Sequence, residues 1–224
     1  MLFQNRREAG QQLAVRLASR RDNPSVIVLG IPRGGVVVAA EVARALHAPL
    51  DVWLTRKLGA PGEPELAIGA VTSDGTVVLD ERLIRELNVP GRFIEQARER
   101  ELAEIGRRME LFRQGRQPLE IARRDVILCD DGVATGATTL AALRALRKYN
   151  PARLILAVPV APSVLVQALE KECDELVVLA TPDPFLAVGR FYLEFDQTTD
   201  EQVMVELNES ARRRLDQTGD SSSG

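Results

Sequence analysis

The stretch that most constrains this chain is residues 126–139, with the sequence VILCDDGVATGATT. Its first four residues are apolar and too few for a helix of their own, so they predict a fully buried central strand. Asp130 and Asp131 follow at the carboxyl end of that strand, where open α/β sheets bind their ligands. Two adjacent carboxylates at such a position indicate a functional role.

The loop after the two acids is built from small residues and leads directly into the helical pattern LAALRALRKY. Such a loop lets several backbone N–H groups and the positive end of the helix dipole converge on one anion, and threonine hydroxyls add donors. We therefore predict a phosphate cradle, formed by Ala134, Thr135, Gly136, Ala137, Thr138 and Thr139. A ribose 5-phosphate would fit, with its hydroxyls on the acids. The alternative is an ordinary strand-to-helix turn capped by Thr135 or Thr138.

The pattern of four apolar residues, two acids, two spacers and Ala-Thr-Gly-Ala-Thr resembles the phosphoribosyl pyrophosphate (PRPP) signature of the type I phosphoribosyltransferases. The resemblance implies transfer of the 5-phosphoribosyl group from PRPP to a nucleobase-like acceptor, with release of pyrophosphate. It also implies an α/β fold with a twisted, mainly parallel sheet flanked by helices, an antiparallel hairpin that serves as a lid, and a small C-terminal hood. Mg²⁺ is the implied cofactor, held mostly through PRPP oxygens and water. A homodimer is the expected assembly.

A glycine-rich turn, residues 30–35, follows the first predicted strand, residues 25–30. Glycine lets a backbone approach a ligand closely, and arginine supplies an always-charged donor fork. Taken alone, the turn suits a tight turn with a surface arginine as well as an anion site. The resemblance favours the anion site, because the corresponding loop of the family binds the pyrophosphate of PRPP, and it implies this role for Pro32, Arg33, Gly34 and Gly35. Family members often hold a non-proline cis peptide in this loop, which we expect at Arg33–Gly34.

A basic pair, Arg56 and Lys57, follows the strand predicted over residues 50–55. A solvated pair is the alternative, but the resemblance implies contacts with pyrophosphate. The charges would then match the reaction, because pyrophosphate gains negative charge as it departs and the ribose ring gains positive charge near the two acids. The candidate catalytic residues are therefore Arg33, Arg56, Lys57, Asp130 and Asp131.

The candidate lid is residues 58–69, which begin in a loop-forming stretch and precede an Asp-Gly hairpin signal near residue 74. A plain connecting loop is the alternative. Further along, buried strands alternate with helices, which predicts a parallel sheet with right-handed crossovers. The expected helices lie at residues 5–20, 81–88, 91–114 and 200–215, and the later strands at residues 152–161 and 174–181. The first helix is interpreted as a plain covering helix.

The candidate hood is residues 182–196, a segment that holds four of the nine aromatic residues of the chain. The family forms a hood over the acceptor base near this point, often with an aromatic ring that stacks on the base, and aromatic faces suit a flat heterocycle. The candidate acceptor-binding residues are Phe185, Val188, Phe191 and Tyr192. Packing of these side chains in the core is the alternative. The polar residues 218–224 are expected to be a disordered tail.

Composition limits the remaining possibilities for this chain of 224 residues. We expect one domain over residues 1–217, because no linker or second motif set divides it. A net charge of −3 disfavours nucleic acid and anionic membranes as partners. No apolar run is long enough to span a membrane, so we expect a cytoplasmic protein. Cys129 and Cys173 lie in apolar surroundings and are predicted to be buried free thiols.

Other nucleotide-binding classes lack their signatures in this sequence, because it contains neither Gly-Lys-[Ser/Thr] nor GxGxxG. The acceptor is also constrained. In family members that act on 6-oxopurines, the residue before the Thr-Gly of the cradle is typically an aspartate that can act as general base. Here it is Ala134, so a 6-oxopurine acceptor that needs this base is disfavoured. The rival to the enzyme is a PRPP-sensing regulatory protein that kept the pocket but lost turnover.

Overall fold

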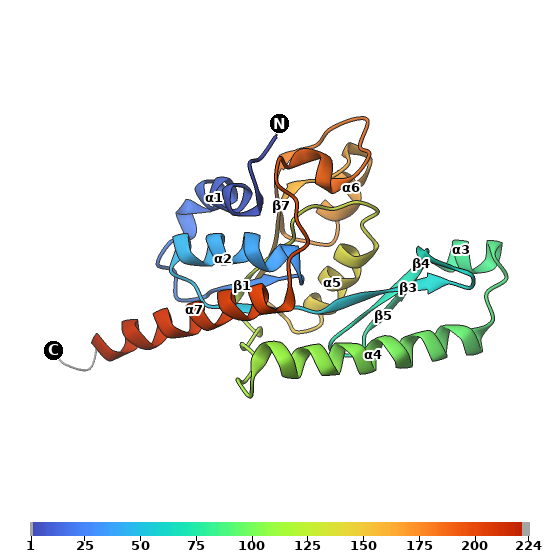
Figure 1. The fold of residues 1–224 in the computed structure, drawn as a ribbon, viewed down its shortest axis with the longest axis horizontal. Coiled ribbons are helices and arrows are strands. Elements are labelled where there is room, and N and C mark those ends of the chain that lie inside the picture. The colour runs from blue at the N-terminus through green and yellow to red at the C-terminus, as the bar shows by residue number, and fades with distance from the viewer. Residues whose placement is uncertain (1, 221–224) are drawn as a thin grey trace.

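The fold is built on a five-stranded sheet in which every neighbouring pair is parallel (Figure 1). The computed structural model describes residues 2–220, except for the side chains of residues 65 and 215–220. The strands run in the order β2 (Leu50–Val52), β1 (Val26–Gly30), β6 (Asp125–Cys129), β7 (Arg153–Val160) and β8 (Glu175–Ala180). The crossovers include helices α2 (Gly34–Leu46), α5 (Ala137–Arg147) and α6 (Ser163–Glu170). The α/β prediction with a mainly parallel sheet is confirmed.

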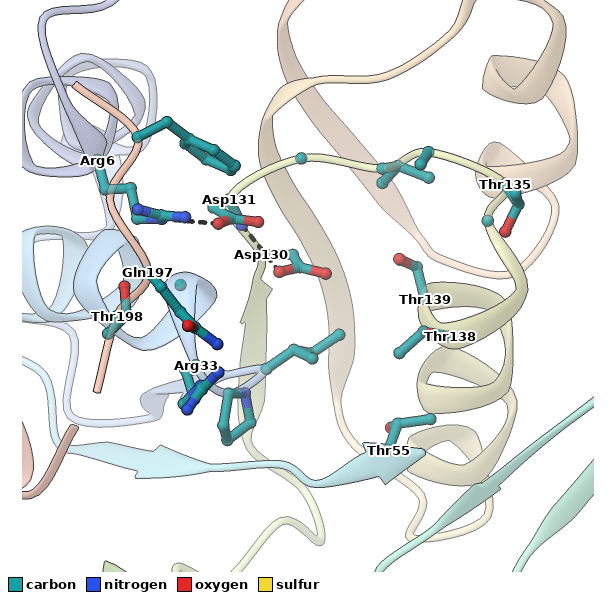
Figure 2. Close-up of a pocket in the computed structure, with 18 residues that line it drawn as sticks. Arg6, Arg33, Thr55, Asp130, Asp131, Thr135, Thr138, Thr139, Gln197 and Thr198 are labelled. Carbon is teal, nitrogen blue, oxygen red and sulfur yellow. Dashed lines mark hydrogen bonds and ion pairs between the residues drawn. The ribbon is translucent and has the colours of Figure 1, made fainter. Parts of the chain in front are cut away.

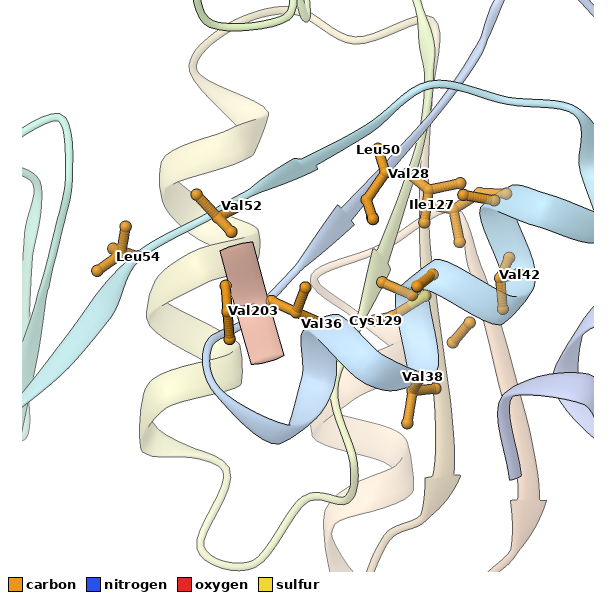
Figure 3. Packing of buried hydrophobic residues seen from close by; sticks show 14 of the residues in the cluster. Val28, Val36, Val38, Val42, Leu50, Val52, Leu54, Ile127, Cys129 and Val203 are labelled. Atoms are coloured by element: carbon orange, nitrogen blue, oxygen red, sulfur yellow. The ribbon is translucent and has the colours of Figure 1, made fainter. Parts of the chain in front are cut away.

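The central strands β1 and β6 bury side chains on both faces of the sheet, as continuous apolar runs predict. Val28 and Ile127 are register partners and point to the face covered by α2 (Figure 3). Their neighbours Ile27 and Leu128 point to the opposite face and pack with residues of α5. Successive side chains of a strand alternate between faces, so two short strands contribute to two separate parts of the core.

Helices α1 (Arg6–Arg16) and α7 (Asp200–Asp220) pack with α2 on one side of the sheet. Buried carboxylates hold the three helices together, because Arg7 of α1 donates hydrogen bonds to Glu41 of α2 at 2.9 Å and to Glu206 of α7 at 2.5 Å. Helix α7 runs to Asp220, five residues beyond its expected end and three residues into the predicted tail. The rest of that tail lies outside the described residues.

A second, antiparallel sheet extends from the parallel one and consists of β3 (Thr55–Ala60), β4 (Glu63–Thr72) and β5 (Val77–Leu79). The candidate lid, residues 58–69, therefore consists of the paired ends of β3 and β4. Its glycine and proline residues had predicted a loop at its start. The pairing shifts register at Leu58, Gly59 and Ala60, where the loop-forming residues lie. Helices α3 (Glu81–Glu86) and α4 (Gly91–Arg113) follow, and α4 runs along this sheet (Figure 1).

The N-terminal segment pairs with the C-terminal hood. Phe3 forms an isolated parallel bridge with Tyr192, its N–H donates to the carbonyl of Phe191 at 2.8 Å, and Leu193 N–H donates to its carbonyl at 2.9 Å. The 3₁₀ helix η2 (Val188–Phe191) belongs to the same hood. The start of α1 is thereby fixed beside the end of the parallel sheet. Within residues 2–220, no helix combines the length and apolar character needed to cross a membrane.

Replacing Phe112 with alanine should destabilise the protein by about 3–5 kcal/mol, because this fully buried ring joins the end of α4 to the main core. Chemical denaturation of the variant and the wild type would measure the loss. Glu99→Ala, an exposed position on the same helix, is the matched control and should change stability by less than about 0.5 kcal/mol. Equal effects of the two substitutions would contradict the packing of α4 against the core.

Candidate active site

A cavity of about 570 Å³ lies at the carboxyl ends of β1 and β6 (Figure 2). Its walls come from the loop after β1, the loop after β6, the first turn of α5, the first residues of α1 and β3, and the segment that precedes α7. The lining residues are Arg6, Ile31, Pro32, Arg33, Gly34, Thr55, Asp130, Asp131, Gly132, Val133, Ala134, Thr135, Gly136, Thr138, Thr139, Phe195, Gln197 and Thr198. The acids, the cradle and the glycine-rich turn predicted from the sequence therefore meet in one cavity.

The two acids lie side by side, and the N–H of Asp131 donates to Oδ1 of Asp130 at 2.9 Å. Burial raises the pKa of Asp130 well above its ordinary value, and the negative charge of Asp131 raises it further. Burial also raises the pKa of Asp131, although the charge of Arg6 and its hydrogen bond oppose this shift. The environment of the pair therefore opposes a double negative charge.

Arg6 is the cation that faces the acid pair, and it was not among the residues selected from the sequence. Its Nε donates to Asp131 Oδ2 at 2.7 Å and its Nη1 donates to the carbonyl of Asp196 at 2.8 Å. The guanidinium carbon lies 3.8 Å from the centroid of the Phe195 ring. Arg6 belongs to the helix interpreted as a plain cover, and no local pattern separates it from the other arginines of that helix.

The loop after β1 approaches the acids so closely that only glycine fits at two positions. A Cβ on Gly34 would lie 1.9 Å from Asp131 Oδ2, and a Cβ on Gly35 would lie 2.8 Å from the Cα of Asp130. The non-proline cis peptide of this loop is Pro32–Arg33, so the expected position, Arg33–Gly34, is wrong by one bond. The Arg33–Gly34 bond belongs instead to the start of α2, where Arg33 is the N-cap and its carbonyl accepts from Val36 N–H at 3.2 Å.

The predicted cradle loop ends at the start of α5. Gly136 is the N-cap of α5 with φ of 80°, and no side-chain hydrogen bond caps the helix at this residue. Neither Thr135 nor Thr138 is therefore the N-cap. The first N–H groups of a helix have no partner within the helix, so here they are available to a ligand. Thr138 and Thr139 lie at the start of α5 across the cavity from Asp130, as Figure 2 shows.

Arg33 extends into the cavity from the side opposite α5 (Figure 2). Its Nη1 lies 3.9 Å from Oδ1 of Asp200, the first residue of α7. That oxygen is buried and has no hydrogen-bond partner among the described residues. Arg33 therefore has a carboxylate behind it and the cavity in front of it.

Arg56 and Lys57, which are predicted to contact pyrophosphate, do not line this cavity. Thr55 faces the cavity, and the next residue of β3, Arg56, turns to α4, where its Nε donates to Glu101 at 2.6 Å. Both basic residues line a neighbouring cavity of about 500 Å³ between the antiparallel sheet and α4. Thr55 lines both cavities, so the first residue of β3 lies between them.

None of the four candidate acceptor-binding residues lines the cavity: Tyr192 is buried, and the other three are partly buried and pack against the same cluster. Tyr192 is 6% exposed and its hydroxyl donates to the carbonyl of Asp131 at 2.6 Å. Phe185 stacks on Phe191 at a centroid distance of 5.3 Å, and Val188 packs where a side chain on Gly132 would lie. The segment before α7 instead contributes residues that were not candidate acceptor-binding residues, namely Phe195, Gln197 and Thr198.

Two of the residues predicted to bind PRPP lie just outside the cavity wall. Gly35 packs under Asp130, and Ala137 faces a cavity on the other side of the cradle loop.

Both predicted buried thiols are confirmed, because Cys129 and Cys173 are free and buried. Burial raises the pKa of the Cys129 thiol, and the charge of Asp130 adds to this effect. Cys129 is therefore poorly suited to act as a nucleophile.

Comparison with protein families identifies the group to which this site belongs. Residues 4–195 match the family model described as "Phosphoribosyl transferase domain". The chain belongs to this family. The predicted family resemblance is therefore confirmed, and the cavity at the ends of β1 and β6 is the candidate active site of a phosphoribosyl transferase domain.

Known relatives agree with this assignment. Two proteins of Mycobacterium tuberculosis, each named "Putative phosphoribosyl transferase", one from strain CDC 1551 and one from strain H37Rv, are 44% identical over 211 residues. The match covers 94% of this chain and 47% of each relative, so the chain spans about half their length. The crystal structure of TT1426 from Thermus thermophilus has a TM-score of 0.78 at 45% identity and covers 93% of this chain and 99% of that one.

Replacing Gly34 with alanine should disrupt the site, because the added Cβ would lie 2.6 Å from Arg6 Nε as well as against Asp131. Overpacking of this kind typically costs about 1–3 kcal/mol. We expect a lower denaturation midpoint and, in a crystal structure, a displaced Asp131 carboxylate. Gly106→Ala in α4 is the control, because no atom lies within 4 Å of its added Cβ. That change should stabilise the helix by about 0.5–1 kcal/mol. Wild-type stability in the Gly34 variant would contradict the close approach of the two loops.

Proposed function

We propose that the protein is a Mg²⁺-dependent phosphoribosyltransferase that transfers the 5-phosphoribosyl group from PRPP to a nucleobase-like acceptor and releases pyrophosphate. One observation carries the proposal: a single cavity has two carboxylates at the end of β6, an uncapped helix start on one side and Arg33 on the other. A sugar that carries phosphate at one end and pyrophosphate at the other matches these three parts.

The 5-phosphate of PRPP is assigned to the cradle loop and the first turn of α5. Backbone N–H groups there can donate to phosphate oxygens, and the helix dipole favours the negative charge. The hydroxyls of Thr135, Thr138 and Thr139 add donors on the same wall. The ribose hydroxyls then lie at Asp130 and Asp131, which can accept hydrogen bonds from both.

In the proposed reaction the bond between C1 of ribose and the pyrophosphate oxygen breaks, and its electron pair leaves with pyrophosphate. A ring nitrogen of the acceptor forms the new bond to C1, and the proton that this nitrogen carried leaves to water or to the departing pyrophosphate. Positive charge develops on the sugar near the acid pair, and negative charge develops on the leaving group near Arg33. Interactions that strengthen with these charges lower the barrier.

Among the described residues, no group of three or more His, Cys, Asp or Glu side chains could hold a metal ion. In the proposal, a Mg²⁺ ion would take its ligands mostly from PRPP oxygens and water, as Mg²⁺ commonly does with phosphates. The ion would supply charge neutralisation for pyrophosphate. Arg33 supplies the protein's own positive charge at the same place.

The pyrophosphate role of Arg56 and Lys57 stays a prediction, because it needs a movement of the antiparallel sheet toward the cavity. For the acceptor, the position of Phe195 and Gln197 on the cavity wall favours the segment before α7 over the aromatics of residues 185–192. Ala134 still disfavours a 6-oxopurine that relies on a general base at this position. A homodimer, a cytoplasmic location and the absence of nucleic acid as a partner are likewise predictions.

A panel of nucleobases and simple analogues, incubated with the protein, PRPP and Mg²⁺, tests the proposed activity through pyrophosphate release. We expect release with at least one base that needs no general base at position 134. Asp130→Asn/Asp131→Asn should abolish this activity and weaken PRPP binding, because neutral amides accept hydrogen bonds from ribose hydroxyls less strongly. Unchanged PRPP affinity of the double variant, measured by calorimetry, would contradict the assigned ribose site.

The rival function, a PRPP sensor without turnover, makes a different prediction for Arg33. If Arg33 stabilises departing pyrophosphate, Arg33→Ala should lower turnover by roughly a hundredfold and weaken PRPP binding far less. Arg82→Ala removes an exposed arginine of α3 and serves as the control with wild-type rates. Equal losses of affinity and of rate at saturation would exclude a catalytic role for Arg33. A wild type that binds PRPP and turns over no base of the panel would indicate the sensor.

A further inference from the structure

We propose that Arg6 is a positioning residue for the ribose site. Arg6 holds Asp131 by Oδ2 and leaves Oδ1 to a ligand hydroxyl. The proposal rests on the proposed function for the identity of the ligand. It assigns a role to the N-terminal helix, which neither the motif nor the resemblance includes.

The Arg6 side chain is held on several sides and is 11% exposed. The ring of Phe195 covers its guanidinium at 3.8 Å, and Tyr192 stacks behind Phe195 at a centroid distance of 4.9 Å. Gly34 lies against Arg6 from the loop after β1, so closely that a Cβ would be 2.6 Å from Nε. A guanidinium fixed in this way loses little further freedom when it binds a carboxylate, so its position fixes that of Asp131.

Both the backbone next to Arg6 and its side chain make further anchoring hydrogen bonds. Asn5 caps α1 by accepting hydrogen bonds from the N–H groups of Arg7 and Glu8. On the other side, Arg6 Nη1 donates to the carbonyl of Asp196 in the segment before α7. Arg6 therefore links the start of α1, the hood and the end of β6 at one point (Figure 2).

The charged and titratable groups around Asp131 come from four parts of the fold. Asp130 is its neighbour at the end of β6, Arg6 reaches it from α1, Arg33 faces the same cavity from the loop after β1, and the Tyr192 hydroxyl of the hood binds its backbone carbonyl. Burial raises the pKa of Asp131, and Arg6 is the largest opposing influence. Loss of Arg6 should therefore raise this pKa further, so that the carboxylate is protonated at a higher pH than in the wild type.

A purely structural role would give different consequences. If Arg6 only tied α1 to the hood, its loss would lower stability and weaken a ligand equally at every pH. If Arg6 positions Asp131, affinity should fall most on the acid side, because a protonated carboxyl accepts hydrogen bonds from hydroxyls poorly. The acid limb of the binding profile should then move to higher pH.

The experiment compares Arg6→Ala, Arg6→Lys and wild type, with Arg16→Ala as the matched control from the exposed side of the same helix. Carbon-13 NMR titration of the Asp131 carboxyl in the ligand-free protein is the first readout. Calorimetry with ribose 5-phosphate across the same pH range is the second. We expect Arg6→Ala to titrate at higher pH and to bind about ten- to a hundredfold more weakly at neutral pH. Arg6→Lys should restore part of both effects, and Arg16→Ala should match the wild type.

The two readouts separate this proposal from the proposed function. An unchanged Asp131 titration in Arg6→Ala, or a pH-independent loss of affinity that Arg6→Lys does not relieve, would overturn the positioning role. A wild type that binds no ribose 5-phosphate, with a shifted titration in Arg6→Ala, would leave the Arg6–Asp131 link standing and would contradict the proposed function. If Arg6→Ala does not fold, the titration of Arg6→Lys against the wild type decides.

Discussion

The neighbouring carboxylates of Asp130 and Asp131 are the constraint on which the rest of the site depends. They end a strand whose apolar residues are fully buried, and removing an uncompensated charge from water is strongly unfavourable. Compensation must therefore come from outside the strand, and Arg6 provides it at 2.7 Å. Because Arg6 lies in the first turn of α1, this helix has to start beside the end of β6. The pairing of Phe3 with the hood holds it there.

The same acids also determine the loop after β1. Gly30 and Cys129 are register partners, so the loops that follow β1 and β6 leave the sheet side by side. Any side chain at Gly34 or Gly35 would collide with an acid, which makes these two glycines a steric requirement of the acid pair. Arg33, the residue before them, lines the same cavity. The glycine-rich turn and the acid pair thus form a single packing unit.

The parts of the site that a sequence can predict are those with a local physical signature. A buried strand, two acids and a small-residue turn before a helix define the cradle without any tertiary information, and the structure brings them together as expected. Arg6 and Phe195 have no such signature, because their roles arise from contacts between segments that are far apart in the sequence, such as Arg6 with Asp196, which are 190 residues apart. Tyr192 shows the reverse limit, because its aromatic signature is ambiguous. An aromatic-rich segment suits both a base and a core, and only the packing with Phe3 and Phe195 shows that this ring is buried.

Arg56 shows how tertiary contacts limit prediction from a basic pair. Thr55 lines both the main cavity and the neighbouring one, whereas the next residue, Arg56, lines only the neighbouring one. There Glu101 of α4 binds it at 2.6 Å, within the helix that runs along the antiparallel sheet. A contribution from Arg56 to the cavity would therefore require the sheet to twist or move and this ion pair to break. Because Glu101 stabilises the present position, α4 would influence the free energy of that movement, which connects the helix to the proposed lid.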